Sequence, residues 1–384
     1  MPVSCSRLRM PRRRRIAWPM RLGRAVAGAA CLVAGCVSLA AAQILPSAHL
    51  ADVTVDWSTF HRYADESDNY HLTWSADDRL YGAYGDGWGF VPTDISKRSI
   101  GVSRITGTWP QLDGRDVWEG GSQGGACCWA SWNGKSWGMV AVGTELHMWF
   151  TIGRPRALGF TEARLASSSD GGRSWRKADW AFGPADGVLM PTFMQLGRGY
   201  TAHGLPPGIV DYAYSYYTRY VAHPGEYQTP GLVMLMRAPK DRLDERATYQ
   251  FYAGTTPEGA PIWTADPRAS GPVLQRPYLL DVAPSVAWNP YLGRFLMVMA
   301  HLPDGDPSGR GVAFYDAPTP WGPWTVIRTY DRFAEGTVFF YQLPTKWMAA
   351  DGSAVLAFSG TDATREWDAL NTVRVRFVTQ NPIP

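Results

Sequence analysis

The 384-residue sequence predicts an all-β protein, a five-bladed β-propeller of four-stranded antiparallel blades. Three observations lead to this fold class. A pair of short apolar units recurs five times, turn-forming residues bound each unit, and a strand-like segment precedes the first pair. The composition agrees with it, because 40 Gly and 29 Pro favour short strands joined by turns over long helices.

The recurring units define the blades. The first unit, a turn that leads into an apolar run, occurs about 60 to 85 residues apart as "DDRLYGAYGDG", "VGTELHMWFT", "PPGIVDYAYSYY", "YLGRFLMVMA" and "ADGSAVLAFSG". The second unit always follows the first, as "SIGVSRITG", "EARLASSSD", "GLVMLMRAPKD", "RGVAFYDAP" and "NTVRVRFVT". Two recurring strands per period predict antiparallel sheets of about four strands, and radial repetition of such sheets is a propeller.

The two ends of the repeat region predict how the ring closes. The segment "ADVTVDWSTF" (51–60) is typical of a strand, and the chain ends soon after the last copy of the second unit. We expect the N-terminal strand to complete the fifth blade. Residues 239–251 are charged and helix-tolerant, so we expect a blade-edge loop with a helical turn there.

One motif supports the same fold. The stretch "SSDGGRSW" has the Asp-box pattern, with Ser168, Asp170, Gly172 and Trp175 at its fixed positions. In such a hairpin turn the carboxylate and hydroxyl accept backbone N–H bonds, and glycine supplies a positive φ. We interpret Asp170 as structural, at the outer edge of a blade. The motif alone does not indicate a sialidase, which would also need an arginine triad and a Tyr/Glu pair.

Residues 1–42 are interpreted as an export signal, which leaves 43–50 as a linker and 51–384 as one propeller domain. Eight arginines up to Arg24 precede an uncharged segment of small apolar residues. A transmembrane anchor is less favoured, because this segment is marginal in length for spanning a bilayer.

Two cleavage sites compete within this signal. The sequence "VAGC" fits a lipobox that would leave a lipidated Cys36, and we favour it; "AAA" before Gln43 fits ordinary signal-peptidase cleavage. Both predict an exported protein, periplasmic or extracellular. Membrane attachment is then expected only through a lipid anchor at Cys36.

The charge that remains after removal of the signal does not support nucleic-acid binding. Eight of the 37 basic residues lie in the first 24 positions, so 29 basic residues face 34 acidic ones and the net charge is −5. Cys127 and Cys128 are neighbours without zinc-like spacing, and we interpret them as two partly buried thiols rather than a strained vicinal disulfide. No cofactor is predicted, and a structural or axial metal ion stays open.

Four stretches together resemble the bacterial family catalogued as the domain of unknown function numbered 4185: "SDNYHLTWSADDRLYGAYGDGWGF", "KRSIGVSRITG", "APTPWGPWTV" and "LPTKWMAADGSAVLAFSG". The resemblance covers roughly residues 60 to 378. That family is related to five-bladed propeller glycosidases, more distantly to family 43-like ones, and contains endo-D-arabinanases classed as glycoside hydrolase family 183. It implies an arabinanase-like, endo-acting enzyme whose substrate is a furanoside.

A glycosidase needs two carboxyl groups that flank the scissile bond. Asp68 precedes a predicted innermost strand, the place where the related glycosidases carry a catalytic Asp, and Asp86 in "YGDGWGF" follows the next strand. Two antiparallel strands joined by the "ADDR" turn are expected to bring both to the same end of the blade. The alternatives are a turn-capping role for Asp68 and a plain hairpin signal at Asp86.

A third acid is expected from another blade. Asp211 stands within an aromatic strand-like segment, where burial of a carboxylate without a partner would be costly, and Asp281 matches Asp68 in position within the fourth blade. The weaker alternatives are Glu119, Glu145, Glu226 and Glu335.

Residues that recognise the substrate are expected near the acids. Asn69, His71, Trp74 and Trp88 neighbour them in the sequence. Lys346 is expected to begin the innermost strand of the fifth blade, where its ammonium would point at the channel or form a structural ion pair. His203 leads into the third blade, as a substrate ligand, a residue near an axial ion, or a structural histidine.

The sequence therefore predicts a monomeric, exported glycoside hydrolase that cleaves a polysaccharide by carboxylate acid/base catalysis at the mouth of the propeller channel. Two other functions stay open: a non-catalytic glycan-binding propeller, and a polysaccharide lyase with a Tyr/His pair in place of the carboxylates. No GxSxG, Walker, dinucleotide or HExxH pattern occurs to support another mechanism.

Overall fold

The computed structural model describes residues 44–90, 97–122, 132, 134–152, 162–220, 231–276, 284–301, 311–362, 364 and 368–380. The predictions for the export signal, Cys36, Cys127, Cys128, Glu226 and Asp281 lie outside these residues. No helix within the described ranges has the length and apolar character needed to cross a membrane.

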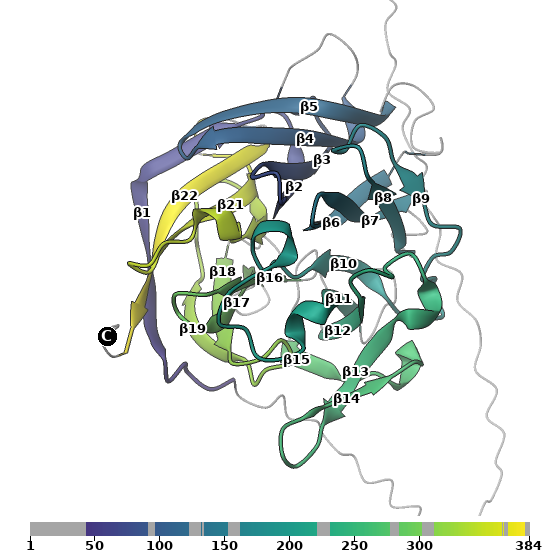
Figure 1. Ribbon diagram of the computed structural model, residues 1–384. Coiled ribbons are helices and arrows are strands. Elements are labelled where there is room, and N and C mark those ends of the chain that lie inside the picture. Colours follow the sequence, from purple (N-terminus) through teal and green to yellow (C-terminus); the bar gives the residue numbers. More distant parts are fainter. Residues whose placement is uncertain are drawn as a thin grey trace, which may run out of the picture. The chain divides into compact units, whose positions relative to one another are not determined.

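The protein is a five-bladed β-propeller, as the sequence predicts. Figure 1 shows the five antiparallel sheets arranged around a common centre, with β2, β6, β10 and β16 nearest to it. Blade 1 comprises β2 (Asp68–Trp74), β3 (Leu80–Gly85), β4 (Arg98–Thr108) and β5 (Gln111–Ser122). Blade 2 comprises β6 (Gly134–Val142), β7 (Glu145–Ile152), β8 (Arg164–Ser168) and β9 (Arg176–Lys177). Blade 4 comprises β16 (Ser285–Asn289), β17 (Arg294–His301), β18 (Gly311–Ala317) and β19 (Thr325–Tyr330).

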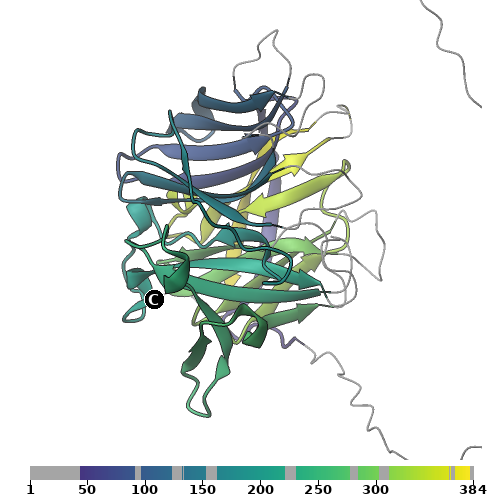
Figure 2. The ribbon, with the colours of Figure 1, turned by 90° about the vertical axis from the view of Figure 1, so that its right-hand side faces the viewer.

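Blade 3 differs from the expected four strands, because its sheet has six. These are β10 (Leu189–Phe193), β11 (Tyr212–Tyr220), β12 (Gly231–Pro239), β13 (Gln250–Thr255), β14 (Pro261–Thr264) and β15 (Pro272–Arg276), of which β15 pairs with β12 beside β13. The β13–β14 hairpin extends beyond the other blades (Figure 2). The added strands come from the long segment between the third and fourth copies of the first unit.

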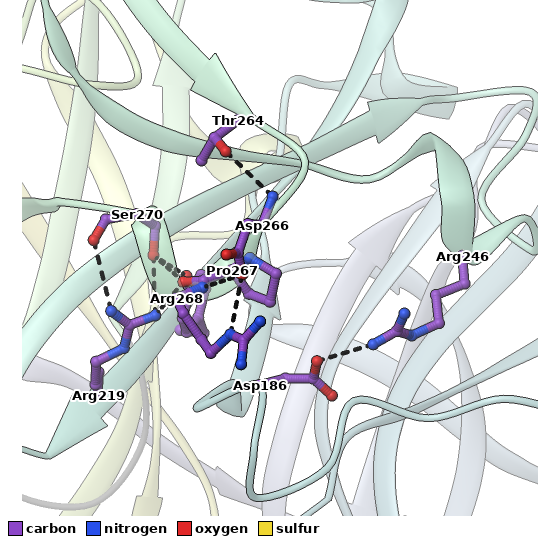
Figure 3. A network of polar contacts seen from close by, with 9 residues as sticks. Asp186, Arg219, Arg246, Thr264, Asp266, Pro267, Arg268 and Ser270 are labelled. Carbon is purple, nitrogen blue, oxygen red and sulfur yellow. Dashed lines mark hydrogen bonds and ion pairs between the residues drawn. The ribbon is translucent and has the colours of Figure 1, made fainter.

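The outer loops of blade 3 are held by charged and polar contacts (Figure 3). Arg219 on β11 donates to the Ser270 hydroxyl (2.9 Å), and Asp266 accepts from the backbone N–H of Arg268 (3.0 Å). Arg246 forms an ion pair with Asp186 at 2.8 Å. These contacts fix the β14–β15 connection and the segment that leads into β10.

Five short 3-10 turns complete the described structure: η2 (Arg198–Tyr200), η3 (Ile209–Asp211), η4 (Arg246–Thr248), η5 (Pro267–Ala269) and η7 (Thr345–Trp347). The turn η4 lies within 239–251, so the expected loop with a helical turn is found there. The two repeat units correspond to the second and third strands of every blade.

The N-terminal strand closes the ring. Blade 5 has the order β20 (Val338–Gln342), β21 (Ser353–Gly360), β22 (Ala369–Thr379) and β1 (Leu50–Tyr63) from the inside outwards. Strand β1 pairs antiparallel with β22, from Leu50 opposite Thr379 to Tyr63 opposite Leu370. Ahead of β1, Ser47 donates to the Val326 carbonyl of blade 4 (2.8 Å).

The apolar core lies between neighbouring blades. Val102 of blade 1 packs with Leu146 and Met148 of blade 2, and Val298 of blade 4 packs with Leu356 of blade 5, all fully buried or nearly so. Strands buried on both faces explain the near-continuous apolar runs from which the repeat is recognised.

The hairpin after β8 carries the Asp-box pattern. The Asp170 carboxylate accepts from the backbone N–H groups of Arg173 and Ser174, both at 3.0 Å, and from the Ser168 hydroxyl at 2.8 Å. Gly171 and Gly172 have φ of 71° and 81°. The Ser174 hydroxyl also donates to this carboxylate at 2.6 Å, and this bond is the largest of the hydrogen-bond effects that lower the pKa of Asp170 to about 2.

Candidate active site

The innermost strands of the five blades run in the same direction. The Thr73 hydroxyl near the end of β2 accepts a hydrogen bond from the Ala141 N–H near the end of β6 (2.9 Å). Gln195, which follows β10, forms a parallel β-bridge with Ala287 of β16. We call the end at which these strands begin the front end, and the other the back end.

Asp68 and Asp86 both lie at the front end of blade 1. Asp68, the first residue of β2, is directly opposite Gly85, the last residue of β3, and Asp86 follows. A Cβ atom on Gly85 would lie only 3.1 Å from Asp68 Oδ1, so the two strand ends are in close contact. Asp86 has a φ of 44°, uncommon for a residue with a side chain. Asp68 and Asp86 therefore lie at the same end of the blade, as expected for two antiparallel strands joined by a turn. Their catalytic roles stay predictions.

The Asp68 side chain is only partly exposed, and one of its two carboxyl oxygens is buried. Its Oδ1 atom has no accessible surface and no hydrogen-bond partner among the described residues. Burial raises the pKa of Asp68 to about 7; Lys135 opposes this rise, and the charges of Asp86 and Asp368 add to it. Asp68 therefore keeps its proton to a much higher pH than an ordinary aspartate does.

Asp86 is in a different environment, although it is adjacent. Its carboxylate forms an ion pair with the Lys135 ammonium, and 45% of its side chain is exposed against 17% for Lys135. Lys135 is on β6, so this ion pair joins blades 1 and 2. Asp68 therefore has a buried carboxyl oxygen without a described partner, whereas Asp86 is half-exposed and ion-paired.

The third acid of the cluster is Asp368, just before β22 of blade 5. Its carbonyl accepts from the Glu66 N–H (2.7 Å), which ties the last blade to the segment that leads into β2. Burial raises the pKa of Asp368; Lys97 opposes this, and Asp86 adds to it. Sequence reasoning missed both Asp368 and Lys135. Lys135 lies near the start of the innermost strand of blade 2, as Asp68 does in blade 1, and this equivalent position could have identified it. For Asp368 the sequence offers only its place just before a predicted strand.

Trp88 belongs to the same end. The Lys97 ammonium is 5.2 Å from the centroid of the Trp88 ring and 3.2 Å from the Glu66 carboxylate. Since Lys97 also acts on the pKa of Asp68 and Asp368, the partly exposed indole borders the acid cluster.

The backbone of the innermost strands is strained towards the front end. Asn69, Met190 and Phe340, in blades 1, 3 and 5, have φ of 59°, 48° and 52°, and each lies at a shift of strand register. Positive φ in residues with side chains costs free energy and is concentrated at functional sites. The buried Oδ1 of Asn69, next to Asp68, also has no hydrogen-bond partner among the described residues.

His71 lies deeper along the channel than the acids. Its ring is 5.5 Å from the Phe340 ring, which in turn is 6.4 Å from the Trp137 ring, so residues of blades 1, 5 and 2 meet near the axis. Burial lowers the pKa of His71 to about 3, and its Nε2 atom has no partner in the described part of the chain. His71 is neutral at physiological pH.

Trp74 and Lys346 do not lie beside the acids, contrary to the sequence-based expectation. Trp74 ends the seven-residue strand that Asp68 begins, so about 20 Å separates them. Lys346 lies in the η7 turn after β20 rather than at the start of that strand, and its ammonium is 2.9 Å from the Asp78 carboxylate and 5.5 Å from the Trp74 ring centroid. The expected channel lysine forms a back-end ion pair.

His203 and Asp211 are also at the back end, in the connection between β10 and β11. His203 is exposed, and its carbonyl accepts from the Trp288 indole (2.9 Å). Asp211 ends the η3 turn and is exposed, so the expectation of a buried acid inside a strand is wrong. The turn keeps the carboxylate in water, and no burial cost arises.

The alternative glutamates are dispersed. Glu119 pairs with Arg98 within blade 1, Glu145 is exposed at the back-end β6–β7 turn, and Glu335 is exposed ahead of β20. No group of three or more His, Cys, Asp or Glu side chains in the described ranges is arranged to hold a metal ion.

No family model and no curated protein matches the sequence. Several solved structures are similar over most of the chain. A GH43_1 enzyme from Xanthomonas citri is 12% identical, with a TM-score of 0.47 over 83% of this chain and 88% of that one. The native arabinanase Arb43A of Bacillus subtilis is 10% identical, with a TM-score of 0.45 over 83% and 96%. A protein of unknown function from Dyadobacter fermentans is 9% identical, with a TM-score of 0.44 over 85% and 98%.

Proposed function

We propose that the protein is a glycoside hydrolase that cleaves a polysaccharide at the front end of the propeller. The observation that carries the proposal is the contrast between two neighbouring acids. Asp68 has a buried Oδ1 atom without a hydrogen-bond partner among the described residues and a pKa raised to about 7, whereas Asp86 is half-exposed and paired with Lys135. Neighbouring carboxyl groups in unlike environments are the arrangement that a glycosidase needs for a proton donor and a charged partner.

In the proposed reaction Asp68 donates its proton to the glycosidic oxygen as the bond to the leaving sugar breaks. The negative charge of Asp86 stabilises the positive charge that develops on the sugar. As a base, Asp86 takes a proton from the water that attacks the sugar carbon; as a nucleophile, it bonds to that carbon until a water that gives its proton to Asp68 displaces it. Asp368 has a supporting role, because its negative charge helps to keep the proton on Asp68. Lys135 orients the Asp86 carboxylate across the blade boundary.

Substrate recognition is assigned to groups around these acids. Trp88 offers an indole for stacking on a sugar face, and the Asn69 Oδ1 atom is an acceptor that still lacks a donor among the described residues. A furanoside, D-arabinan in particular, is the substrate implied by the family resemblance of the sequence. An exported monomer, with a lipid anchor at Cys36, is consistent with action on a wall or environmental polymer.

The test is incubation of the protein with a panel of furanose and pyranose polymers, comparing wild type with Asp68→Asn and Asp86→Asn. We expect oligosaccharides from wild type only, with a loss of about 10²- to 10⁴-fold in rate for Asp68→Asn. Asp113→Asn is the matched control, because Asp113 is an exposed aspartate on the outermost strand of the same blade.

Three results would contradict the hydrolase. Retention of polymer without turnover would indicate a glycan-binding propeller. An unsaturated product that absorbs in the ultraviolet would indicate a lyase. Full activity of both aspartate variants on a cleaved polymer would place the chemistry elsewhere.

A further inference from the structure

A pocket lies on blade 5, and none of the three acids of the cluster lines it. It has a volume of about 610 Å³, within the usual range for small-ligand sites. Its lining residues are aromatic at the base and polar around the rim: Trp57, Phe60, Arg332, Phe333, Ala334, Glu335, Phe358, Thr361, Asp362 and Thr364.

An irregularity in the closing strand builds this pocket. Along β1 the pairing with β22 passes from Asp56 opposite Arg374 to His61 opposite Thr372, so residues 57–60 bulge out of the ladder. The bulge is held in place, since Thr59 accepts from the Arg374 N–H at 2.9 Å. Bulges redirect side chains, and this one carries Trp57 and Phe60 over the buried rings of Phe333 and Phe358.

Trp57 is unusual among the aromatic residues around it. It is 43% exposed, although its ring centroid is only 5.0 Å from that of Phe333, which is 5% exposed. A large exposed indole at the edge of an aromatic pocket is an apolar platform with a polar tip. Such platforms suit a flat ligand that has one apolar face.

The rim indicates that the ligand is neutral. Arg332 and Glu335 are both exposed and carry opposite charges three residues apart. The Asp362 carboxylate is neutralised by Arg62 at 3.2 Å and accepts from the Thr364 N–H and hydroxyl, both at 2.7 Å. No net charge dominates, while donors and acceptors of hydrogen bonds stand around an aromatic base.

The pocket faces the same end as the acid cluster. Its residues 332–335, together with 361, 362 and 364, flank Val338 and Gly360, which pair at the front end of blade 5. Arg62, the partner of Asp362, also lowers the pKa of Asp368. The pocket and the acid cluster therefore lie at the same end of blade 5 and have Arg62 as a common neighbour.

We propose that this pocket binds a sugar unit of a neutral polysaccharide, with Trp57 as the stacking platform and Arg332 and Glu335 as ligands of ring hydroxyls. The pocket is a holding site apart from the acid cluster. The choice of a polysaccharide that also reaches the acids rests on the proposed function, whereas binding in the pocket does not depend on catalysis.

The experiment uses the full chain with Asp68→Asn, which slows consumption of the ligand. An arabinofuranose hexasaccharide and a xylopyranose hexasaccharide are titrated by calorimetry, with a galacturonate hexasaccharide as the charged comparison. We expect Trp57→Ala to weaken binding of one neutral probe about tenfold, and Arg332→Ala or Glu335→Gln to weaken it less. Tyr291→Ala is the control, because Tyr291 is 48% exposed on a blade 4 turn outside the pocket.

The outcomes separate this proposal from the proposed function. Equal affinity of the Trp57→Ala and Tyr291→Ala proteins, or Trp57-dependent binding of the charged probe alone, overturns the pocket assignment even if the enzyme is active. Trp57-dependent binding of a neutral probe supports it even if no polymer is cleaved. In an active enzyme, Trp57→Ala should also raise KM for long polymers.

Discussion

The ammonium group of Lys135, on the innermost strand of blade 2, forms an ion pair with the Asp86 carboxylate of blade 1. The same ammonium is the largest influence that lowers the pKa of Asp68, against the effect of burial. One lysine thus holds one acid of the candidate site in place and limits the proton affinity of the other.

Replacement of Lys135 by methionine should move the pH dependence of catalysis upwards. If Asp68 is the proton donor, kcat/KM of wild type falls as pH rises through about 7, where Asp68 loses its proton. Removal of the positive charge raises the pKa of Asp68, so the midpoint of this alkaline limb moves to higher pH. The measurement is a pH–rate profile from pH 4 to 10.

Lys97→Met is the matched control for this experiment. Lys97 lowers the pKa of Asp68 in the same sense as Lys135, but it is the smallest of the named influences. The midpoint of the alkaline limb in the Lys97→Met variant should therefore move in the same direction as in Lys135→Met, but by less. An unchanged midpoint in both variants would show that Asp68 does not control the alkaline limb.

Replacement of Asp68 by asparagine should stabilise the fold at alkaline pH while it lowers activity. The folded-state pKa of about 7 exceeds the ordinary 3.8, so the stability that the neutral carboxyl contributes is complete below pH 4 and is lost as pH rises through 7. Each unit of pKa difference corresponds to roughly 1.4 kcal/mol, which sets the gain at pH 8 at up to a few kcal/mol. Urea unfolding at pH 4 and pH 8 measures it, and equal differences between the two proteins at both pH values would refute the buried-acid description.

His71 should govern the acid side of the stability profile. Its pKa falls from 6.5 to about 3 on burial, so the stability present above pH 6.5 is lost as pH falls towards 3, because only the unfolded chain takes up the proton. A His71→Gln variant should unfold with a weaker dependence on pH between 6.5 and 4. His147, whose pKa burial lowers to about 4, acts in the same direction and remains in the variant, so the dependence should shrink without vanishing.

The sequence predicts the ring because the signals for it are local. Each strand pair is bounded by its own turn residues. The run at 51–60 precedes the first repeat, so it is available to complete the last blade as β1. The third blade shows the limit of this approach, since the extra strands β13 to β15 lack the apolar runs of the repeat. Their pairing depends on tertiary contacts.

The site is harder to predict, because residues that are close in the chain can lie at opposite ends of a blade. Trp74 is six residues from Asp68, yet an extended strand carries it to the other end. Lys346 is displaced because β20 ends before it. Lys135 and Asp368 reach Asp86 and Asp68 from other blades, which only the closed ring brings together.

Lys346→Met should distinguish the two ends of the propeller. The Lys346–Asp78 pair is partly exposed, with 20% and 55% of the side chains accessible, so its loss should cost about 0 to 1 kcal/mol of folding free energy. Activity should stay at the wild-type level because the pair lies at the back end. A large loss of kcat without a loss of folded protein would mean that substrate reaches the back end.

Gly85→Ala tests whether the close approach of the two strand ends positions Asp68. A methyl group at Gly85 would lie 3.1 Å from both Asp68 Oδ1 and the Ser99 carbonyl, and 3.3 Å from Asn69 Nδ2, so these groups must move apart. We expect a loss of roughly 1 to 3 kcal/mol in stability from overpacking. Activity should fall further than the unfolded fraction explains, because the carboxyl group that must give up its proton is displaced.

Gly183→Ala is the control, since a methyl group there meets no atom within 4 Å. Activity of Gly85→Ala that matches the Gly183→Ala protein would mean that the carboxyl group tolerates displacement, and Asp68 would lose its claim to be the proton donor.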